Sequence, residues 1–178
     1  ELADRMTAQT SETWPPIIAT GSRDYSALLE GDPVTRPTGG PEDEAWLFYT
    51  SGTTGRPKGA VLTHRNLLFM IHTYLADIDF IGPGDTMVHA APLSHGAGLY
   101  GLTHVARGSH NVVLGGSFDP ERVLATFSQY QNVSIWAAPT MIVRLINHPK
   151  AGSADTRGLK TIIYGGAPMY LADLKRAI

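Results

Sequence analysis

Short apolar segments alternate with helical segments along the second half of the chain. The segments rich in β-branched and other apolar residues are residues 86–91, 110–114, 133–138 and 159–164. Between them lie runs in which apolar side chains recur at three- and four-residue spacing, as in an amphipathic helix. Parallel strands must be joined by connections long enough to hold a helix, so this alternation is typical of a parallel β-sheet flanked by helices. The sequence therefore predicts an α/β fold.

The first part of the chain carries fewer regular elements. Residues 1–44 are rich in Thr, Ser, Gly, Pro and acidic residues, which predicts irregular structure with one short helix around residues 26–29. A longer helix is predicted from a Thr63 cap to about Asp77, with one buried face that includes Tyr74 and Ile78.

A strong break in the pattern follows this helix. The sequence Gly82-Pro83-Gly84-Asp85 is typical of a turn. We therefore expect residues 1–81 to be the end of a first subdomain and residues 82–178 to be part of a second α/β subdomain. The chain begins with Glu1 and closes in a helical pattern without a terminating residue, so we also expect it to be an interior piece of a longer protein.

The stretch between two short apolar strands, residues 45–49 and 60–62, is rich in hydroxyl groups and glycines. It reads Thr50-Ser51-Gly52-Thr53-Thr54-Gly55-Arg56-Pro57-Lys58-Gly59. Hydroxyls, backbone N–H groups left accessible by glycine and a lysine ammonium are the groups that bind phosphate oxygens. The sequence therefore predicts a loop that binds a polyphosphate.

This loop allows two other interpretations. The common nucleotide-binding pattern G-x-x-x-x-G-K-[ST] does not fit, because Pro57 precedes Lys58 and Gly59 follows it. This argues against a GTPase or ATPase of that class. A Ser/Thr/Gly-rich hairpin loop without a ligand remains an alternative.

The segment after the strand at residues 86–91 contains a histidine among small residues. It reads Pro92-Leu93-Ser94-His95-Gly96-Ala97-Gly98-Leu99-Tyr100-Gly101, and its glycines match the G-x-G-x-x-G pattern of NAD-dependent dehydrogenases. Against that alternative, Pro92 to His95 separate the strand from the glycines, and Gly115 stands where the acidic residue of that fold is expected. His95 is either a site residue or a structural histidine hydrogen-bonded to a carbonyl.

The last predicted strand ends at Gly165-Gly166-Ala167-Pro168. Ligands of open α/β sheets bind at the carboxyl ends of strands, where bare glycine backbone can lie against a flat ligand. A plain turn from strand to helix explains the same residues equally well.

Taken together, these motifs resemble the adenylate-forming superfamily, which includes acyl-CoA synthetases, luciferases and the adenylation domains of peptide synthetases. The resemblance rests on Thr50 to Gly59 with the following Leu62-Thr63-His64-Arg65-Asn66-Leu67, on Pro92 to His95, on Pro139-Thr140-Met141 and on Gly165 to Pro168. Ser94 departs from the aromatic residue that is more usual before the histidine. The resemblance implies a fragment of the family's large N-terminal domain, a parallel β-sheet flanked by helices, with the C-terminal domain absent.

The resemblance also implies roles for single residues. Those that would hold the β- and γ-phosphates of ATP are Thr50, Ser51, Gly52, Thr53, Thr54, Gly55 and Lys58, with Mg²⁺ near Thr53 and Thr54. Those that would border adenine and the acyl group are Gly165, Gly166, Ala167 and Pro168. The acid substrate would contact His95, in the wall of its tunnel, and Thr140.

The activity that the resemblance implies is ATP-dependent conversion of a carboxylic acid to acyl-AMP, followed by thioester formation with coenzyme A, as in fatty acid metabolism. No acidic residue lies between Pro92 and Arg107, where an amino-acid-activating domain would carry one, and this favours a simple acyl or aryl acid. Family elements expected beyond Ile178 are an acidic residue near Mg²⁺, a ribose-binding aspartate and a C-terminal lysine, so we expect the piece alone to be inactive. A non-catalytic nucleotide- or phosphate-binding module is the alternative from another class.

The charge and amino-acid composition of the chain limit the binding partners and the cellular location that we expect. The net charge is −2 and basic residues are scattered, so neither nucleic acid nor an anionic membrane is an expected partner. The chain has no cysteine, which fits a reducing compartment. No apolar run reaches the roughly 20 residues of a membrane-spanning helix. We therefore expect a cytoplasmic protein without a transmembrane segment.

Overall fold

The computed structural model describes residues 18–32, 39–50 and 58–178. The chain divides into two compact units, one that ends at Thr38 and one that runs from Gly39 to Ile178. Every described residue that the sequence suggested for a site belongs to the second unit. The predicted boundary between residues 81 and 82 separates two subdomains of the complete protein. It differs from the division after Thr38, and it stays a prediction.

The first unit contains a short helix, α2 (Arg23–Leu29). Ser22 caps it, because its hydroxyl accepts a hydrogen bond from the backbone N–H of Tyr25 at 3.1 Å. The short helix predicted around residues 26–29 is therefore confirmed, with three further residues at its start.

The second unit begins with a hairpin and a helix. Strands β1 (Glu44–Thr50) and β2 (Lys58–Thr63) pair antiparallel, and α3 (His64–Asp77) follows directly. Thr63 and Asn66 form a reciprocal cap, in which the Thr63 hydroxyl accepts from the Asn66 N–H and the Asn66 side chain accepts from the Thr63 N–H. Both the Thr63 cap and the end of α3 at Asp77 agree with the prediction from sequence.

A parallel sheet of four strands forms the centre of this unit, in the order β4-β3-β5-β6. Its strands are β3 (Thr86–His89), β4 (His110–Val113), β5 (Val133–Ala137) and β6 (Leu159–Tyr164). The helical elements between and after them are α4 (Gly96–Ala106), α5 (Pro120–Gln129), α6 (Pro139–Ile146), the 3₁₀ turn η1 (Ala151–Ser153) and α7 (Leu171–Ala177). The predicted α/β fold is confirmed.

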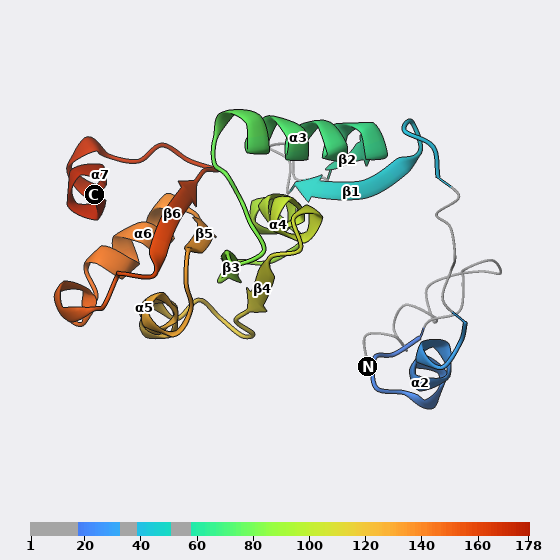
Figure 1. Cartoon of the computed structure of the whole chain (residues 1–178), viewed down its shortest axis with the longest axis horizontal. Helices are drawn as coiled ribbons and strands as arrows, with labels where there is room; N and C mark the ends of the chain where they lie inside the picture. Colours follow the sequence, from blue (N-terminus) through green and yellow to red (C-terminus); the bar gives the residue numbers. More distant parts are fainter. Residues whose placement is uncertain (1–17, 33–38, 51–57) are drawn as a thin grey trace. The chain divides into compact units, whose positions relative to one another are not determined.

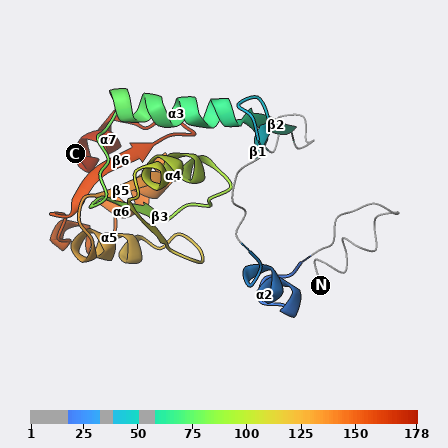
Figure 2. The same ribbon diagram turned by 45° about the vertical axis from the view of Figure 1, so that its right-hand side comes forward.

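Helices cover both faces of the sheet (Figures 1 and 2). Alternate residues of a strand point to opposite faces. Val133, Ile135 and Ala137 of β5 are buried in one apolar core with residues of α5 and α6, so that pair of helices covers one face. Trp136 points the other way, where its ring lies against Gly96 of α4. Helix α4 therefore covers the second face, and α3 packs on α4.

A cluster of charges joins the amino end of β6 to the segment before β3. The Nζ of Lys160 lies 2.9 Å from Oδ2 of Asp85 and 3.1 Å from Oδ1 of Asp79, and it also donates to the carbonyl of Phe80. Burial raises the pKa of Asp85, but hydrogen bonds from Lys160 and from the Gly82 N–H outweigh that effect and hold the pKa below its ordinary value. The cluster fixes the start of β6, whose other end leads to Gly165.

The direction in which the chain adds strands to the sheet reverses between β3 and β5. The chain passes from β3 to its neighbour β4 at one edge, and then crosses to β5 and β6 on the other side of β3. In open α/β sheets the carboxyl ends of strands at such a reversal leave a crevice, where ligands bind. The fold thus points to the carboxyl ends of β3 and β5 as the place to look for a site.

Candidate active site

A cavity of about 580 Å³ lies at this reversal point. The residues that line it are Phe48, Tyr49, His95, Gly96, Tyr100, Trp136, Gly165 and Gly166. They come from the end of β1, the start of α4, the end of β5 and the turn after β6, so segments far apart in the sequence meet here. Two of the stretches singled out from sequence, at His95 and at Gly165-Gly166, share this cavity.

His95 stands at the start of α4, and its ring forms part of the cavity wall. Its Nδ1 lies 2.9 Å from the carbonyl oxygen of Ser94. A carbonyl only accepts hydrogen bonds, so Nδ1 carries the hydrogen, and Nε2 of the neutral ring is an acceptor. The ring centroid is 5.7 Å from that of Phe48 in β1. His95 thus has the carbonyl partner of a structural histidine and also an exposed position in the cavity.

The Gly165-Gly166 pair forms another part of the cavity wall. Gly166 has φ +87°, a left-handed conformation that residues with a side chain rarely adopt. A methyl group on Gly165 would lie 3.9 Å from Nε1 of Trp136, so backbone and indole are in contact distance there. Ala167 and Pro168 follow in exposed positions and are not among the described residues that line the cavity.

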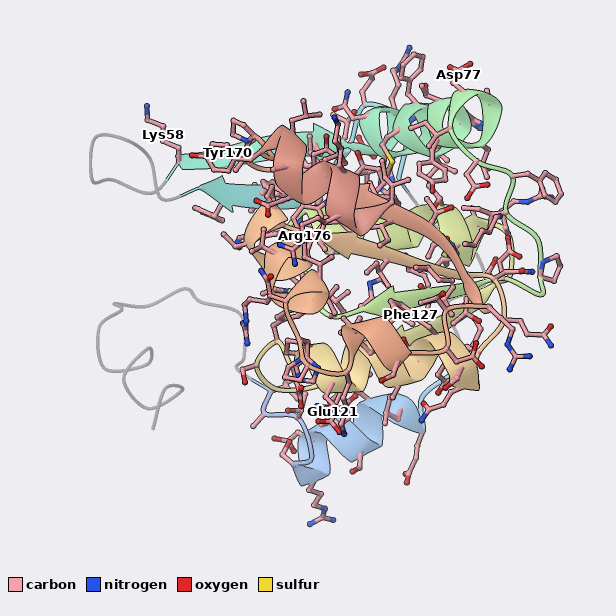
Figure 3. The ribbon with its side chains drawn as sticks, turned by 90° about the vertical axis from the view of Figure 1, so that its left-hand side faces the viewer. Lys58, Asp77, Glu121, Phe127, Tyr170 and Arg176 are labelled. Carbon is pink, nitrogen blue, oxygen red and sulfur yellow. The ribbon has the colours of Figure 1, made fainter. Side chains whose placement is uncertain are left out.

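The strand that leads into the hydroxyl-rich loop passes the same cavity. Thr50 ends β1 and is the Cα partner of Lys58, which opens β2, while Phe48 and Tyr49 line the cavity. The Lys58 side chain is exposed and extends away from the ribbon (Figure 3). The remaining predicted loop residues, Ser51, Gly52, Thr53, Thr54 and Gly55, lie outside the described residues.

Thr140 does not meet the other candidates. It lies in the first turn of α6, after Pro139, and its side chain is exposed. Of the described residues, those that line the cavity do not include it. The structure therefore gives no geometric support for its predicted contact with an acid substrate.

The glycines of the G-x-G-x-x-G match have a packing role. A methyl group on Gly96 would lie 2.8 Å from Cζ2 of Trp136, and one on Gly101 would lie 2.5 Å from Cε1 of His89. A methyl group on Gly98 would run into the carbonyl of Leu93. Each glycine lets α4 approach another part of the protein closely, which explains the pattern without a dinucleotide.

Sequence reasoning missed the aromatic residues of the cavity. The sequence pattern places Trp136 only in a strand, and Phe48 and Tyr49 only in the strand before the loop. Tyr100, also in the wall, packs edge-to-face on the buried Tyr74 of α3 at 5.9 Å between ring centroids. The available signal was the position of Trp136 near the carboxyl end of a strand, where ligands of α/β sheets bind.

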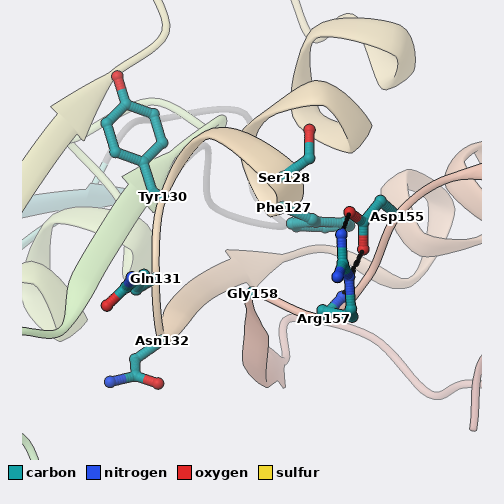
Figure 4. Close-up of a pocket in the computed structure, with 8 residues that line it drawn as sticks. All are labelled: Phe127, Ser128, Tyr130, Gln131, Asn132, Asp155, Arg157 and Gly158. Atoms are coloured by element: carbon teal, nitrogen blue, oxygen red, sulfur yellow. Dashed lines mark hydrogen bonds and ion pairs between the residues drawn. The ribbon is translucent and has the colours of Figure 1, made fainter.

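A second hollow, of about 370 Å³, lies at the opposite ends of β5 and β6 (Figure 4). Its lining includes Asn132, just before β5, and Gly158, just before β6. Its two charged groups neutralise each other, since Arg157 donates to both carboxylate oxygens of Asp155. These hydrogen bonds lower the pKa of Asp155 to about 2. The charges of this hollow are thus already paired, and it is not our candidate site.

Two further findings concern ions and membranes. Within residues 18–32, 39–50 and 58–178, no group of three or more His, Asp or Glu side chains is placed to hold a metal ion. The Mg²⁺ predicted near Thr53 and Thr54 falls outside these ranges. No helix in the same ranges has both the length and the apolar character needed to cross a bilayer.

Comparison with known proteins agrees with the resemblance seen in the sequence. The chain is 39% identical over 142 residues to a feruloyl-CoA synthase of an Amycolatopsis species, an alignment that covers 79% of this chain and 28% of that protein. It is 28% identical to the medium/long-chain-fatty-acid–CoA ligase FadD8 of Mycobacterium tuberculosis, over 86% of this chain and 26% of that protein. The chain therefore spans less than a third of the length of these curated relatives.

Solved structures show the same relationship. The inhibitor-bound N-terminal domain of FACL13 from Mycobacterium tuberculosis superposes with a TM-score of 0.76 at 25% identity, covering 98% of this chain and 45% of that one. ATP-bound MatB from Rhodopseudomonas palustris superposes with a TM-score of 0.70 at 27% identity, covering 86% of this chain and 30% of that one. The family model described as AMP-binding enzyme matches residues 3–178, and the chain therefore belongs to the AMP-binding, adenylate-forming enzyme family.

Proposed function

We propose that the complete protein is an acid:thiol ligase that joins a carboxylic acid to AMP and then transfers the acyl group to coenzyme A. One observation carries this proposal beyond family membership. The cavity at the carboxyl ends of the strands brings His95 together with Gly165 and Gly166, beside the strand that leads into the hydroxyl-rich loop. An acid and a nucleotide could therefore meet at one place.

The first step would be attack of a carboxylate oxygen on the α-phosphorus of ATP. A new oxygen–phosphorus bond forms, and the bond to the β-phosphate oxygen breaks to release pyrophosphate. Such phosphoryl-transfer steps depend mainly on positioning and charge neutralisation. Residues 50–55 and Lys58 would supply hydroxyls, N–H groups and a positive charge to the departing phosphates. Mg²⁺ would accompany those phosphates near Thr53 and Thr54.

The second step would be attack of the coenzyme A sulfur on the acyl carbon of acyl-AMP. The bond from that carbon to the phosphate oxygen breaks, AMP leaves, and the thiol proton passes to solvent. In this scheme His95 walls the acid's path to the nucleotide, while Gly165 to Pro168 border the adenine. A simple acyl or aryl acid is the proposed substrate class.

The proposal extends to the parts of the protein. Residues 1–81 would close one subdomain and carry the phosphate loop, and residues 82–178 would belong to a second one. We also propose that the 178-residue chain does not turn over by itself. Incubation of that chain with ATP, acids and labelled pyrophosphate is expected to give no exchange into ATP.

The test of function uses the complete protein. With ATP and a panel of acids, pyrophosphate exchange should appear without coenzyme A, and acyl-CoA should appear once coenzyme A is added. Lys58→Ala should reduce exchange by at least about tenfold, since a charge-assisted contact to phosphate contributes about 1.5–3 kcal/mol. Lys150→Ala is the matched control, because Lys150 is an exposed lysine paired with Glu121 and lies outside the cavity lining.

Two results would contradict the proposal. One is ATP binding by the complete protein without exchange for any acid, which would favour a non-catalytic nucleotide-binding module. The other is equal exchange by the Lys58→Ala and Lys150→Ala variants, which would remove the loop from the mechanism.

A further inference from the structure

The indole of Trp136 lies between two glycine positions of the cavity wall. A methyl group on Gly96 would lie 2.8 Å from its Cζ2 and 3.2 Å from its Nε1. A methyl group on Gly165 would lie 3.9 Å from Nε1 and 4.0 Å from Cζ2. The same edge of the indole therefore faces both α4 and the turn after β6, and its position sets how closely these two walls approach each other.

Trp136 is not needed for the apolar core of the sheet. The core beneath α5 and α6 takes its β5 residues from Val133, Ile135 and Ala137, all of which are buried. Trp136 points to the other face, is only half-buried and lines the cavity. A large aromatic side chain contributes to packing by being buried, whereas one that stays accessible in a cavity of ligand size can contact a ligand.

The cavity has the chemical character of a site for a flat ring. Ring side chains from different elements surround it: Phe48, Tyr49, His95, Tyr100 and Trp136. No Asp, Glu, Lys or Arg is among the described residues of its lining. Aromatic faces stack on planar groups, whereas a flexible alkyl chain gains only area burial from them and loses rotational freedom.

We propose that Trp136 is a specificity-determining residue that makes the cavity prefer acids carrying a flat aromatic or conjugated group over straight-chain fatty acids. The inference rests on the proposed acid:thiol ligase function and names the substrate class of its site. Ser94, which stands before His95, offers no aromatic surface, so Trp136 supplies the wall from a neighbouring strand. Gly96 is the residue that makes room for it.

The experiment compares cinnamic acid with nonanoic acid, which has the same number of carbon atoms, in the complete protein. For Trp136→Leu, kcat/KM for cinnamic acid should fall by about tenfold, as expected for loss of an aromatic contact, while the value for nonanoic acid stays or rises. Trp136→Phe keeps a flat ring and should retain most of the preference. KM for ATP should change by less than about twofold in both variants.

A matched control comes from a second tryptophan. Trp46 of β1 touches α4, since a methyl group on Gly98 would lie 2.9 Å from its Cη2, but it does not line the cavity. Trp46→Leu should leave the ratio of the two acids unchanged. Gly96→Ala tests the fit of the indole in a second way. The new methyl group would lie 2.8 Å from the indole and force it to move, so ring-substituted cinnamic acids should lose more activity than cinnamic acid itself.

The outcomes separate this inference from the function on which it rests. An unchanged ratio of the two acids in a folded Trp136→Leu protein overturns the inference and leaves the ligase function standing. A change confined to KM for ATP also overturns it, because the flat group on Trp136 would then be adenine. A wild-type protein that makes no acyl-CoA from any acid overturns the proposed function and the inference with it.

Discussion

Replacement of Lys160 by methionine tests how the sheet holds its edge strand. Lys160 is the second residue of β6 and is surrounded by Asp79, Asp85 and the carbonyl of Phe80, all of which precede β3. The side chains are 27% exposed for Lys160, 16% for Asp79 and 9% for Asp85. Methionine keeps most of the length and apolar surface of lysine while removing the charge, so the change isolates the ionic contacts.

The expected loss of stability follows from this burial. Removal of one partner from a fully buried ion pair costs about 3–5 kcal/mol, because the other charge stays buried without compensation. Lys160 retains some access to water, which lowers the estimate to about 2–3 kcal/mol at pH 7. With a urea m-value of about 2 kcal/mol per molar, the unfolding midpoint should fall by roughly 1–1.5 M.

The effect should depend on pH in a defined direction. Hydrogen bonds from Lys160 and Gly82 outweigh burial and lower the pKa of Asp85 in the folded wild type. A carboxylate with a lowered folded-state pKa adds stability above its unfolded value of about 4, and this contribution is lost as the pH falls through the folded value. Lys160→Met removes the hydrogen bond that does most to lower the pKa of Asp85, so the variant loses most of this contribution. The difference between the proteins should therefore be largest at neutral pH and shrink below about pH 4.

The assay is urea unfolding of the complete protein at neutral and acidic pH, followed by tryptophan fluorescence. Lys150→Met is the control, since it makes the same chemical change at an exposed pair with Glu121 and should leave the midpoint nearly unchanged. Equal midpoints for the Lys160→Met and Lys150→Met variants would refute the reasoning. A deficit of Lys160→Met that is the same at neutral and acidic pH would show that the charges are not its cause.

Two further predictions concern packing and alkaline stability. Gly158→Ala should lower the free energy of unfolding by about 1–3 kcal/mol, because the new methyl group would run into two backbone carbonyls, whereas Gly152→Ala meets nothing within 4 Å and should be neutral. Equal urea midpoints for these two variants would contradict this. Burial, with the nearby Asp79 carboxylate, raises the pKa of Tyr74 to about 12, so the wild type should lose stability as the pH rises from about 10 to 12. Tyr74→Phe should remove this part of the pH dependence, and identical alkaline unfolding curves for the two proteins would show the assignment to be wrong.

Local elements were predictable because their causes lie within a few residues of sequence. The Thr63 cap and the end of α3 at Asp77 depend on contacts between near neighbours. Ile78, predicted on the buried face of α3, is 60% exposed. It is the residue after the last helical one, so the helical spacing no longer determines where its side chain points.

Strand lengths were less predictable. The strand expected at residues 86–91 ends at His89, where its pairing with Val113 of β4 also ends. The strand predicted at residues 159–164 has the same bounds in the structure. It pairs with β5 along this length, up to the pair of Ala137 and Tyr164. A strand extends only as far as its partner, and that partner is not visible in the local sequence.

The sequence by itself determined the class of fold, the capped helices and the family, because periodicity, caps and the hydroxyl-rich motif are all written in consecutive residues. Only the tertiary structure showed that His95 and Gly165 share one cavity, that Trp136 fits between Gly96 and Gly165, and that Lys160 is held by Asp79 and Asp85. These contacts join residues that are distant along the chain. They exist because the strand order places particular strand ends side by side, and that order is fixed by packing of the whole sheet.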